Sequence, residues 1–490
     1  MLRLCRSNVQ NMQQTMPNWL QNRAYLTPNR VAIEWSKQEI TFATLHKQVE
    51  KTVRQLTTYR IYKGDTVAVH MTNSIEMILV IHALQYMGVV AVLLNTRLTI
   101  EEIKWQVEDA NAKQLICDTY IEGISIPQIT TAQWSMGKEA SIELQTHYHL
   151  DDVTTILYTS GTTGNPKGVM LTYGNHYHSA IGSALNLGLH QDDSWLACLP
   201  MFHVGGFSLL MKSIIYGMKI VMHESFDVRA VYNDMMKGKV TLISVVTKTL
   251  QEIITLADQP FPKTFRCALL GGGPAPISLI EECLEKGVNV YQTYGMTETA
   301  SQIATLAPEY VLAKIGSAGK PLFPCELQIR KDGTNVSAYE EGEIVVKGPN
   351  VTQGYYNREE ATKETIQDGW LYTGDIGYLD DEGFLYVLDR RKDLIISGGE
   401  NIYPAQIEAA LMSHPQIMDA GVIGMEDDQW GQVPVAFVIA SGLSAEEIFD
   451  YCYTKLARYK VPKHIYFTDS LPRNASNKLV RRNLYEWLGE

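Results

Sequence analysis

The stretch YTSGTTGNPKGV, from Tyr158 to Val169, guides the interpretation of the whole chain. It holds three glycines, four serine or threonine residues, a proline and a lysine, and so offers almost no side chain to bury. The preceding run VTTILYT is apolar and β-branched, which predicts a strand that ends where the loop begins. Successive backbone N–H groups in such turns form anion-binding concavities, and Lys167 adds a positive charge. The stretch therefore predicts a cradle for a polyphosphate.

This loop is not a Walker A loop, because Gly168 follows Lys167 where that motif requires serine or threonine. A flexible surface loop is the structural alternative. Companion stretches elsewhere favour binding, since each places glycines, prolines, carboxylates or basic residues beside apolar runs. They are LLGGGPAP (269–276), YQTYGMTET (291–299), YTGD (372–375), DRRKDLIISGGENIYP (389–404) and LPRNASNKLVRR (471–482). We expect YTGD to form a turn that presents its carboxylate.

Composition and charge narrow the class of protein. The chain has 490 residues, 45% hydrophobic content and a net charge of -12, and it lacks a basic face, so nucleic acid is not an expected partner. Its seven cysteines form no CxxC pair, which argues against a disulfide framework or a zinc site and suits a cytoplasmic protein. The N-terminal residues lack the apolar segment of a secretion signal. The composition leaves room for a homo-oligomer.

The alternation of strand-like and helical runs predicts an α/β fold. We expect a large N-terminal domain over residues 1–391, with layered sheets and a β-rich subdomain from about residue 316, followed by a small mobile α+β domain over residues 392–490. The most apolar run, Met77–Leu94, predicts a buried helix, a stop at Gly88 and a buried strand rather than a membrane span. In the C-terminal domain, helices are predicted from Pro404 to Met412 and from Ser444 to Leu456.

Taken together, the motifs resemble the adenylate-forming superfamily of acyl-CoA synthetases, firefly luciferase and nonribosomal-peptide adenylation domains, in family order over nearly the whole chain. The stretches LLNTRL, LPMFHVGG, LLGGGPAP, QTYGMTET and SGGENIYPAQIE are most similar to members that ligate CoA to 2-succinylbenzoate, an aromatic keto-diacid, in menaquinone biosynthesis. The resemblance implies a two-step reaction. The acid attacks ATP to give acyl-AMP and pyrophosphate, and the CoA thiol then displaces AMP.

The resemblance also implies where ATP and Mg²⁺ bind. The phosphates would lie against the loop residues Thr159, Ser160, Gly161, Thr162, Thr163, Gly164 and Lys167. Adenine would lie against Gly273, Pro274, Ala275, Tyr294 and Gly295. Thr297 and Thr163 would reach the α-phosphate, Asp375 would accept hydrogen bonds from the ribose with Arg390 beside it, and Glu298 would hold Mg²⁺, a hard cation that prefers carboxylate oxygen.

Lys478 matches the family's C-terminal catalytic lysine, which bridges the α-phosphate and the attacking carboxylate and stabilises the charge that develops there. A solvated lysine near the chain end is the structural alternative. In the family the C-terminal domain rotates between the two steps about a hinge that matches Lys392. Rotation would withdraw Lys478 and bring Gly398 and Gly399 beside the pantetheine arm of CoA.

A diacid needs a second group to bind its distal carboxylate, because a buried carboxylate requires a cation or several donors. Arg97 and Lys212 are the candidates, and a structural salt bridge is the alternative for each. His203 would line or gate the acyl pocket, although a structural histidine is common. Gly205 and Gly206 would leave room for an aromatic ring. Two further glycines complete the predicted acyl pocket, Gly271 and Gly272.

Three other functions remain open at this point. The core motifs also fit a CoA ligase for another aryl or medium-chain acid. They fit an enzyme that only adenylates an acid and loads it onto a separate carrier protein. A luciferase-like monooxygenase shares the adenylation motifs as well, although the glycine pair expected to lie beside CoA favours ligation.

Overall fold

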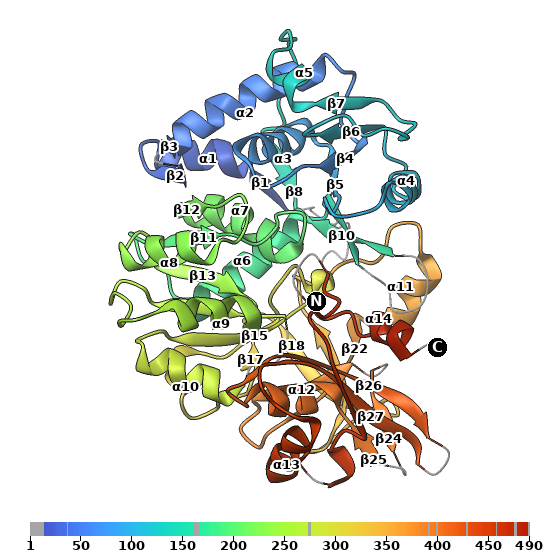
Figure 1. Ribbon diagram of the computed structural model, residues 1–490. Helices are drawn as coiled ribbons and strands as arrows, with labels where there is room; N and C mark the ends of the chain where they lie inside the picture. Colours follow the sequence, from blue (N-terminus) through green and yellow to red (C-terminus); the bar gives the residue numbers. More distant parts are fainter. Residues whose placement is uncertain are drawn as a thin grey trace, which may run out of the picture.

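The computed structural model describes residues 14–36, 38–159, 166–272, 276–390, 393–397, 400–427, 430–456, 458–474 and 478–488. Figure 1 shows a large N-terminal part built from several sheets, with the strands of residues 395–467 in a separate sheet below it. The fold is mixed α/β, as the sequence predicts. The predicted domain boundary between residues 391 and 392 lies outside the described residues and stays a prediction.

The first sheet has the strand order β10-β9-β5-β4-β6-β7. Its strands are parallel except at β10, which runs antiparallel to β9. The bounds are β4 (Thr66–His70), β5 (Val90–Leu93), β6 (Gln114–Cys117), β7 (Gln128–Thr130), β9 (Val153–Thr159) and β10 (Lys167–Thr172). Helices around it are α2 (Phe42–Thr57), α3 (Ile75–Met87), α4 (Ile100–Asp109) and α5 (Thr131–Ser135), and a two-stranded sheet pairs β1 (Thr15–Pro17) with β8 (His147–His149).

The apolar run Met77–Leu94 folds as predicted. α3 is buried on almost every side and ends at Gly88, whose φ of 67° lies in the left-handed region that favours glycine, and β5 follows. Its apolar character therefore reflects burial between layers. No helix in the described part of the chain is long and apolar enough to cross a membrane.

The second sheet has nine strands in the order β17-β16-β15-β14-β13-β11-β12-β2-β3. The bounds are β2 (Val31–Trp35), β3 (Gln38–Thr41), β11 (Ser194–Ala197), β12 (Lys219–Met222), β13 (Leu242–Val245), β14 (Cys267–Leu270), β15 (Val290–Tyr294), β16 (Ala304–Thr305) and β17 (Lys320–Pro321). Helices of this layer are α1 (Trp19–Leu26), α6 (Tyr173–Leu187), α7 (Val204–Tyr216), α8 (Val228–Met236), α9 (Thr247–Leu256) and α10 (Ile277–Glu285). Its central strands are parallel, so their carboxyl ends meet at one edge.

The predicted β-rich subdomain forms a third sheet. Its elements are β18 (Glu326–Lys331), β19 (Thr334–Asn335), β20 (Gly342–Lys347), α11 (Glu359–Thr365), β21 (Ile366–Gln367), β22 (Trp370–Leu379) and β23 (Leu385–Arg390). The prediction that YTGD forms a turn is wrong, because these residues lie inside β22. The pairing of β20 with β22 shifts here, and Gly374 has a φ of 73°, so a β-bulge re-aims Asp375 without ending the strand.

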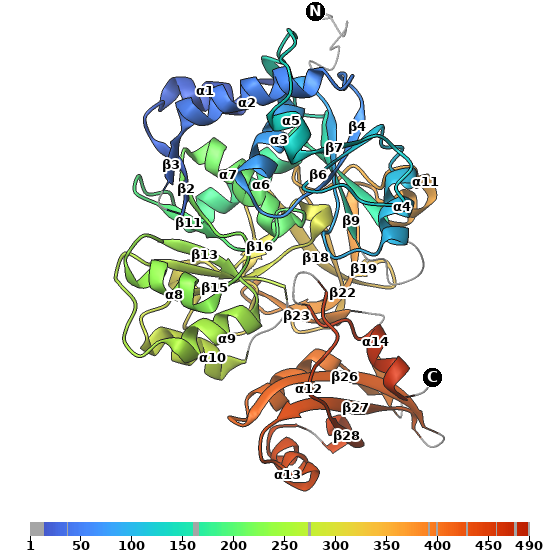
Figure 2. The same cartoon turned by 45° about the horizontal axis from the view of Figure 1, so that its top comes forward.

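The C-terminal part has its own sheet and core. Its elements are β24 (Ile395–Ser397), β25 (Glu400–Ile402), α12 (Pro404–Met412), β26 (Ile417–Asp427), β27 (Gly431–Ala440), α13 (Ala445–Lys455), β28 (His464–Phe467) and α14 (Arg482–Tyr485). Both predicted helices are confirmed, with Pro404 in the first turn of α12 and Ser444 capping α13. Figure 2 shows this part below the large one, with α14 on the side that faces β23.

Six of the seven cysteines lie in the described residues, and all six are free thiols. Five of them are buried, and burial raises the pKa of the buried thiols, as at Cys198, where it reaches about 12. Within the described residues the prediction of unpaired cysteines is confirmed.

Candidate active site

The predicted phosphate loop joins two antiparallel strands. Thr159, at the end of β9, lies opposite Lys167, at the start of β10. The six residues between positions 159 and 166, which include Ser160, Gly161, Thr162, Thr163 and Gly164, lie outside the described residues, so their contact with phosphate stays a prediction. The strand pairing nevertheless fixes both ends of the loop, and it places Lys167 at its base.

Tyr355 connects Lys167 to the predicted magnesium ligand. The Lys167 ammonium lies 5.0 Å from the centre of the Tyr355 ring, and the Tyr355 hydroxyl donates a 3.0 Å hydrogen bond to Glu298 Oε1. Glu298 and Thr297 lie in a single 3₁₀ turn, Thr297–Thr299, directly after β15. The Glu298 side chain is buried. A buried carboxylate contacted by a neutral hydroxyl fits the binding of a divalent cation such as Mg²⁺.

Gly295 lets the chain turn between β15 and this 3₁₀ turn. A Cβ atom at this position would lie 1.7 Å from the carbonyl oxygen of Ser301, so no other residue fits without a backbone shift. The glycine of the QTYG stretch is therefore required by the close approach of two backbone segments. Gly295 therefore joins the end of β15, which carries Tyr294, to the 3₁₀ turn, which carries Glu298.

The predicted ribose site brings together three strands. The Tyr294 hydroxyl donates a 2.7 Å hydrogen bond to Asp375 Oδ2, and both side chains are buried. Across β22 and β23, the backbone of Asp375 pairs with that of Arg390. The strand pairing makes Arg390 a backbone neighbour of Asp375, and the role of its side chain at the ribose stays a prediction. Gly273, Pro274 and Ala275, the rest of the predicted adenine site, lie outside the described residues.

Lys478 reaches the N-terminal part of the protein. A Cβ atom built at Gly272 would lie 3.0 Å from Lys478 Cε and 3.9 Å from its Nζ. The backbone of Lys478 is held by Asn474, whose side chain accepts its N–H at 2.9 Å and whose own N–H donates to its carbonyl at 2.9 Å. Lys478 is exposed to solvent but lies beside Gly272, so its catalytic role stays a prediction.

His203 lies where the charges of the site converge. It precedes α7, and its Nε2 is buried with no hydrogen-bond partner among the described residues. Burial, together with the positive charges of Lys478 and Arg97, lowers the pKa of His203 to about 4. The imidazole is therefore neutral at physiological pH, and its buried nitrogen is available to a bound substrate.

Lys212 is the deepest cation of the predicted acyl pocket. It lies on α7, is 2% exposed, and donates a 2.7 Å hydrogen bond to Gln302 Oε1. Its ammonium lies 4.9 Å from the centre of the Trp195 ring. Burial lowers the pKa of Lys212 to about 7. Among the described residues no carboxylate forms an ion pair with Lys212, so the structural salt bridge proposed as the alternative is absent there.

The pocket glycines play different parts. A Cβ atom at Gly205 would meet only the Leu199 side chain at 3.6 Å, so this position is open. At Gly206 it would lie 2.2 Å from the carbonyl oxygen of Pro200. The prediction that Gly206 leaves room for a ring is therefore wrong, because the backbone of residue 200 already occupies that space. A Cβ atom at Gly271 would lie 3.3 Å from the methyl group of Thr293.

Arg97 lies in the turn before α4, is exposed, and donates its backbone N–H to Asn95 Oδ1 at 2.9 Å. It forms no ion pair with any described residue, and it is close enough to lower the pKa of His203. The predicted residues for CoA binding and rotation lie outside the described residues, namely Lys392, Gly398 and Gly399.

Sequence reasoning missed two residues that connect the predicted ones. Tyr355 follows a glycine, and nothing in the sequence alone indicates that it contacts both Lys167 and Glu298. Gln302 binds Lys212 and also donates to Thr305 Oγ1 at 2.9 Å. Both are ordinary polar residues whose partners are far away in the chain, so only the tertiary structure could identify them.

Two family profiles cover most of the chain. The profile described as "AMP-binding enzyme" matches residues 20–356, and the one described as "AMP-binding enzyme C-terminal domain" matches residues 406–478. The chain therefore belongs to the family of AMP-binding enzymes.

Within this family the chain is similar to named ligases. It is 58% identical to the 2-succinylbenzoate–CoA ligase of Bacillus cereus (strain ATCC 10987 / NRS 248), over 97% of this chain and 100% of that protein. The o-succinylbenzoate CoA synthetase of Bacillus subtilis, solved with the acyl-adenylate intermediate OSB-AMP, superposes with a TM-score of 0.92 at 50% identity, over 96% of this chain and 98% of that one.

The Bacillus subtilis enzyme has also been solved in other complexes. Its complex with ATP and magnesium ion gives a TM-score of 0.92 at 49% identity, over 96% of this chain and 100% of that one. A double mutant bound with its product analogue OSB-NCoA gives a TM-score of 0.77 at 50% identity, over 96% of this chain and 99% of that one.

Proposed function

We propose that this protein ligates CoA to 2-succinylbenzoate in two steps, with release of pyrophosphate and then AMP, and that it serves menaquinone biosynthesis. One observation carries the proposal. Lys478, from the C-terminal part, contacts Gly272 and acts electrostatically on His203 in the N-terminal part. The similarity to 2-succinylbenzoate–CoA ligases at 58% identity over almost the full length supports the same substrate.

In the first step the chain has to bring two anions together, the substrate carboxylate and the α-phosphate of ATP. Lys478 supplies the mobile positive charge that screens them and stabilises the charge on the equatorial oxygens at phosphorus. Glu298 would hold Mg²⁺, which neutralises phosphate charge when bound. Asp375 accepts hydrogen bonds from the ribose hydroxyls, and Tyr294 fixes the orientation of its carboxylate.

The distal carboxylate of the substrate binds Lys212. This ammonium lies in a dry environment between Trp195 and Gln302, where an anion gains more from a cation than it would in water. Arg97, at the exposed side of the site, assists by attracting the dianion. Neutral His203 presents its buried Nε2 to the keto-acid chain.

In the second step the thiol of CoA displaces AMP after the C-terminal domain rotates. The different similarity of this structure to two kinds of Bacillus subtilis complex supports this step for the present chain. Its nucleotide complexes match this structure at a TM-score of 0.92, whereas the product-analogue complex of a double mutant matches at 0.77 with equal coverage of this chain. This difference supports assigning the present structure to the adenylating arrangement.

A coupled assay tests the proposal. The purified protein is incubated with ATP, Mg²⁺ and CoA against 2-succinylbenzoate, 3-benzoylpropionate, benzoate and octanoate, and pyrophosphate, AMP and thioester are measured. We expect thioester with 2-succinylbenzoate at a kcat/KM at least tenfold above the other acids. Preference for octanoate or benzoate would assign a different acyl substrate, and pyrophosphate release without thioester would assign adenylation alone.

A further inference from the structure

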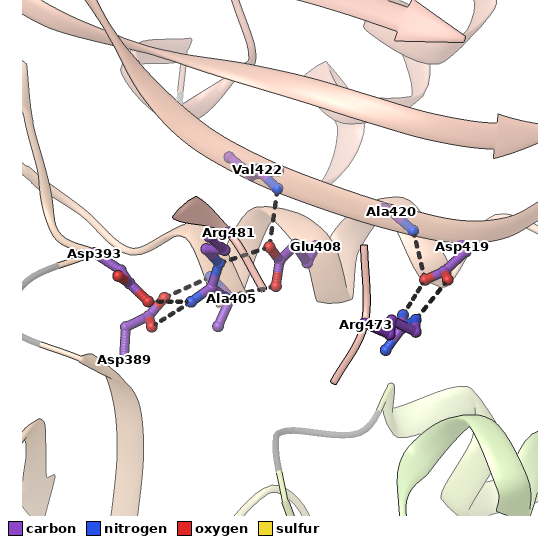
Figure 3. Close-up of polar contacts among 9 residues, drawn as sticks. All are labelled: Asp389, Asp393, Ala405, Glu408, Asp419, Ala420, Val422, Arg473 and Arg481. Atoms are coloured by element: carbon purple, nitrogen blue, oxygen red, sulfur yellow. Dashed lines mark hydrogen bonds and ion pairs between the residues drawn. The ribbon is translucent and has the colours of Figure 1, made fainter. Parts of the chain in front are cut away.

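One arginine close to Lys478 binds carboxylates on both sides of the connection between the two domains. Arg481 follows Lys478 by three residues. Its Nη1 donates to Asp389 Oδ1 at 3.0 Å and to Asp393 Oδ2 at 2.8 Å, while Nε and Nη2 donate to Glu408 at 2.9 and 2.7 Å. Figure 3 shows the guanidinium between these three carboxylates.

These partners do not belong to the same part of the protein. Asp389 lies in β23, which pairs with β22 of the third sheet in the N-terminal part. Asp393 and Glu408 lie beyond the predicted pivot at position 392, and Glu408 is on α12 of the C-terminal part. The hydrogen bond between Arg481 and Asp389 therefore crosses the pivot, while the bonds to Asp393 and Glu408 lie on one side of it.

Asp389 makes a second contact across the pivot. Its Oδ2 accepts the backbone N–H of Ala405, at the start of α12, at 2.7 Å, and its side chain is 4% exposed. A buried carboxylate that binds a guanidinium and a helix N-terminus is a strong acceptor. Both contacts require α12 and the segment that carries Lys478 to stay in their present orientation toward β23.

A second arginine on the same segment provides a contrast. Arg473, five residues before Lys478, donates to both oxygens of Asp419 on β26, at 3.1 and 2.5 Å. Both residues of this pair belong to the C-terminal part, as Figure 3 shows beside the Arg481 cluster. Rotation of the C-terminal domain would leave the Arg473 pair intact and would separate Arg481 from Asp389.

We propose that Arg481 is a positioning residue for the adenylation step, which it supports by binding Asp389 across the pivot and so holding Lys478 against the N-terminal site. Release of Asp389 then accompanies the rotation that precedes thioester formation. This inference rests on the proposed two-step function. The cluster also biases the orientation of the C-terminal domain. One guanidinium does not neutralise three carboxylates, so once Arg481 has left Asp389 the repulsion between like charges favours separation of Asp389 from the other two.

Two isosteric variants test the inference. Each removes the charge of one carboxylate that binds Arg481 Nη1, and the two carboxylates lie on opposite sides of the pivot. Asp389→Asn is expected to slow pyrophosphate release with 2-succinylbenzoate and ATP about tenfold, and to change thioester formation from preformed acyl-adenylate less than twofold. Asp393→Asn, the matched control, is expected to change the ratio of the two rates less than twofold. Arg473→Lys serves as the control for a pair within one domain.

Thermal unfolding of each variant shows whether it folds. Domain orientation is measured independently of any acid, by electron spin resonance distances between labels at two exposed positions, Met136 and Tyr453, with ATP present. We expect a second distance population in Asp389→Asn and a single one in the wild type and in Asp393→Asn. Equal distance distributions in the two aspartate variants, or equal loss of both half-reactions, would overturn the inference. Absence of pyrophosphate release by the wild type would instead overturn the proposed function, and the distances would still decide the role of Arg481.

Discussion

Replacement of Lys212 by methionine separates two effects of this residue. One is its binding of the distal carboxylate of the substrate, and the other is the cost of its buried charge to the free energy of unfolding. Methionine has a similar length and volume but no charge. Burial lowers the pKa of Lys212 from 10.5 to about 7, so the charged form is disfavoured in the folded protein. At about 1.4 kcal/mol for each tenfold change in the ionisation constant, the difference amounts to about 5 kcal/mol.

The sign of the effect on stability follows from linkage. Because the folded pKa lies below the unfolded one, the penalty is fully present below about pH 7 and is lost as the pH rises toward 10.5. Lys212→Met is therefore expected to raise the free energy of unfolding by about 4 kcal/mol at pH 6, after about 1 kcal/mol is subtracted for the Gln302 carbonyl that loses its donor. At pH 10 the two proteins are expected to be similar in stability.

The effect on binding has the opposite sign. Only the charged form of Lys212 binds the distal carboxylate, and the charged fraction falls about tenfold between pH 6 and pH 8 when the pKa is about 7. The KM for 2-succinylbenzoate is therefore expected to rise about tenfold over this range relative to the KM for 3-benzoylpropionate, which lacks that carboxylate. His203, with a pKa of about 4, stays neutral throughout and adds no such dependence.

Steady-state kinetics with both acids from pH 6 to 8, together with urea unfolding, measure these effects. In Lys212→Met the ratio of the two KM values should lose its pH dependence. Lys219→Met is the matched control, because Lys219 is a half-buried lysine that pairs with Glu34 away from the site. A Lys212→Met protein that binds the diacid as well as the wild type at pH 6 would refute this role for Lys212.

Three further predictions concern other residues of the site. Lys478→Ala should lower pyrophosphate release at least a hundredfold and leave thioester formation from preformed acyl-adenylate within about threefold, as single-turnover kinetics can show; equal losses would contradict a role confined to adenylation. Tyr355→Phe removes the hydrogen bond to Glu298 and should raise the Mg²⁺ concentration needed for half-maximal pyrophosphate release about fivefold, and an unchanged Mg²⁺ dependence would exclude this positioning role. Gly295→Ala forces a Cβ against the carbonyl oxygen of Ser301 and should lower the free energy of unfolding in urea by about 3 kcal/mol, and an unchanged value would contradict the requirement for glycine here.

Local patterns allowed much of the architecture to be predicted. The run from Met77 to Leu94 predicts a helix, a stop and a strand because Gly88 interrupts it, and the structure has this arrangement. Ser444 caps α13 and Pro404 begins α12 for reasons that act within one helical turn. Such features depend on neighbours in the chain, so sequence is sufficient to find them.

The two wrong predictions both involve glycine. The sequence predicts a turn at Gly374, but this residue forms a bulge within β22, because the pairing with β20 continues on both sides of it. The sequence also predicts that Gly206 leaves space for a ligand, but the backbone at Pro200 fills that space. A glycine permits close approach and unusual φ, but the sequence does not show which neighbour approaches.

The sequence by itself determined the α/β class, the family and the residue types of the site, because strand and helix patterns, glycine loops and paired motifs are local chemical properties of the chain. Only the tertiary structure decided which of these residues meet. Lys478 lies against Gly272, Tyr355 links Lys167 to Glu298, and Arg481 binds Asp389, across separations in the chain that no local rule spans. These contacts exist because the packing of the sheets, rather than the order of residues, sets the distances between distant charged groups.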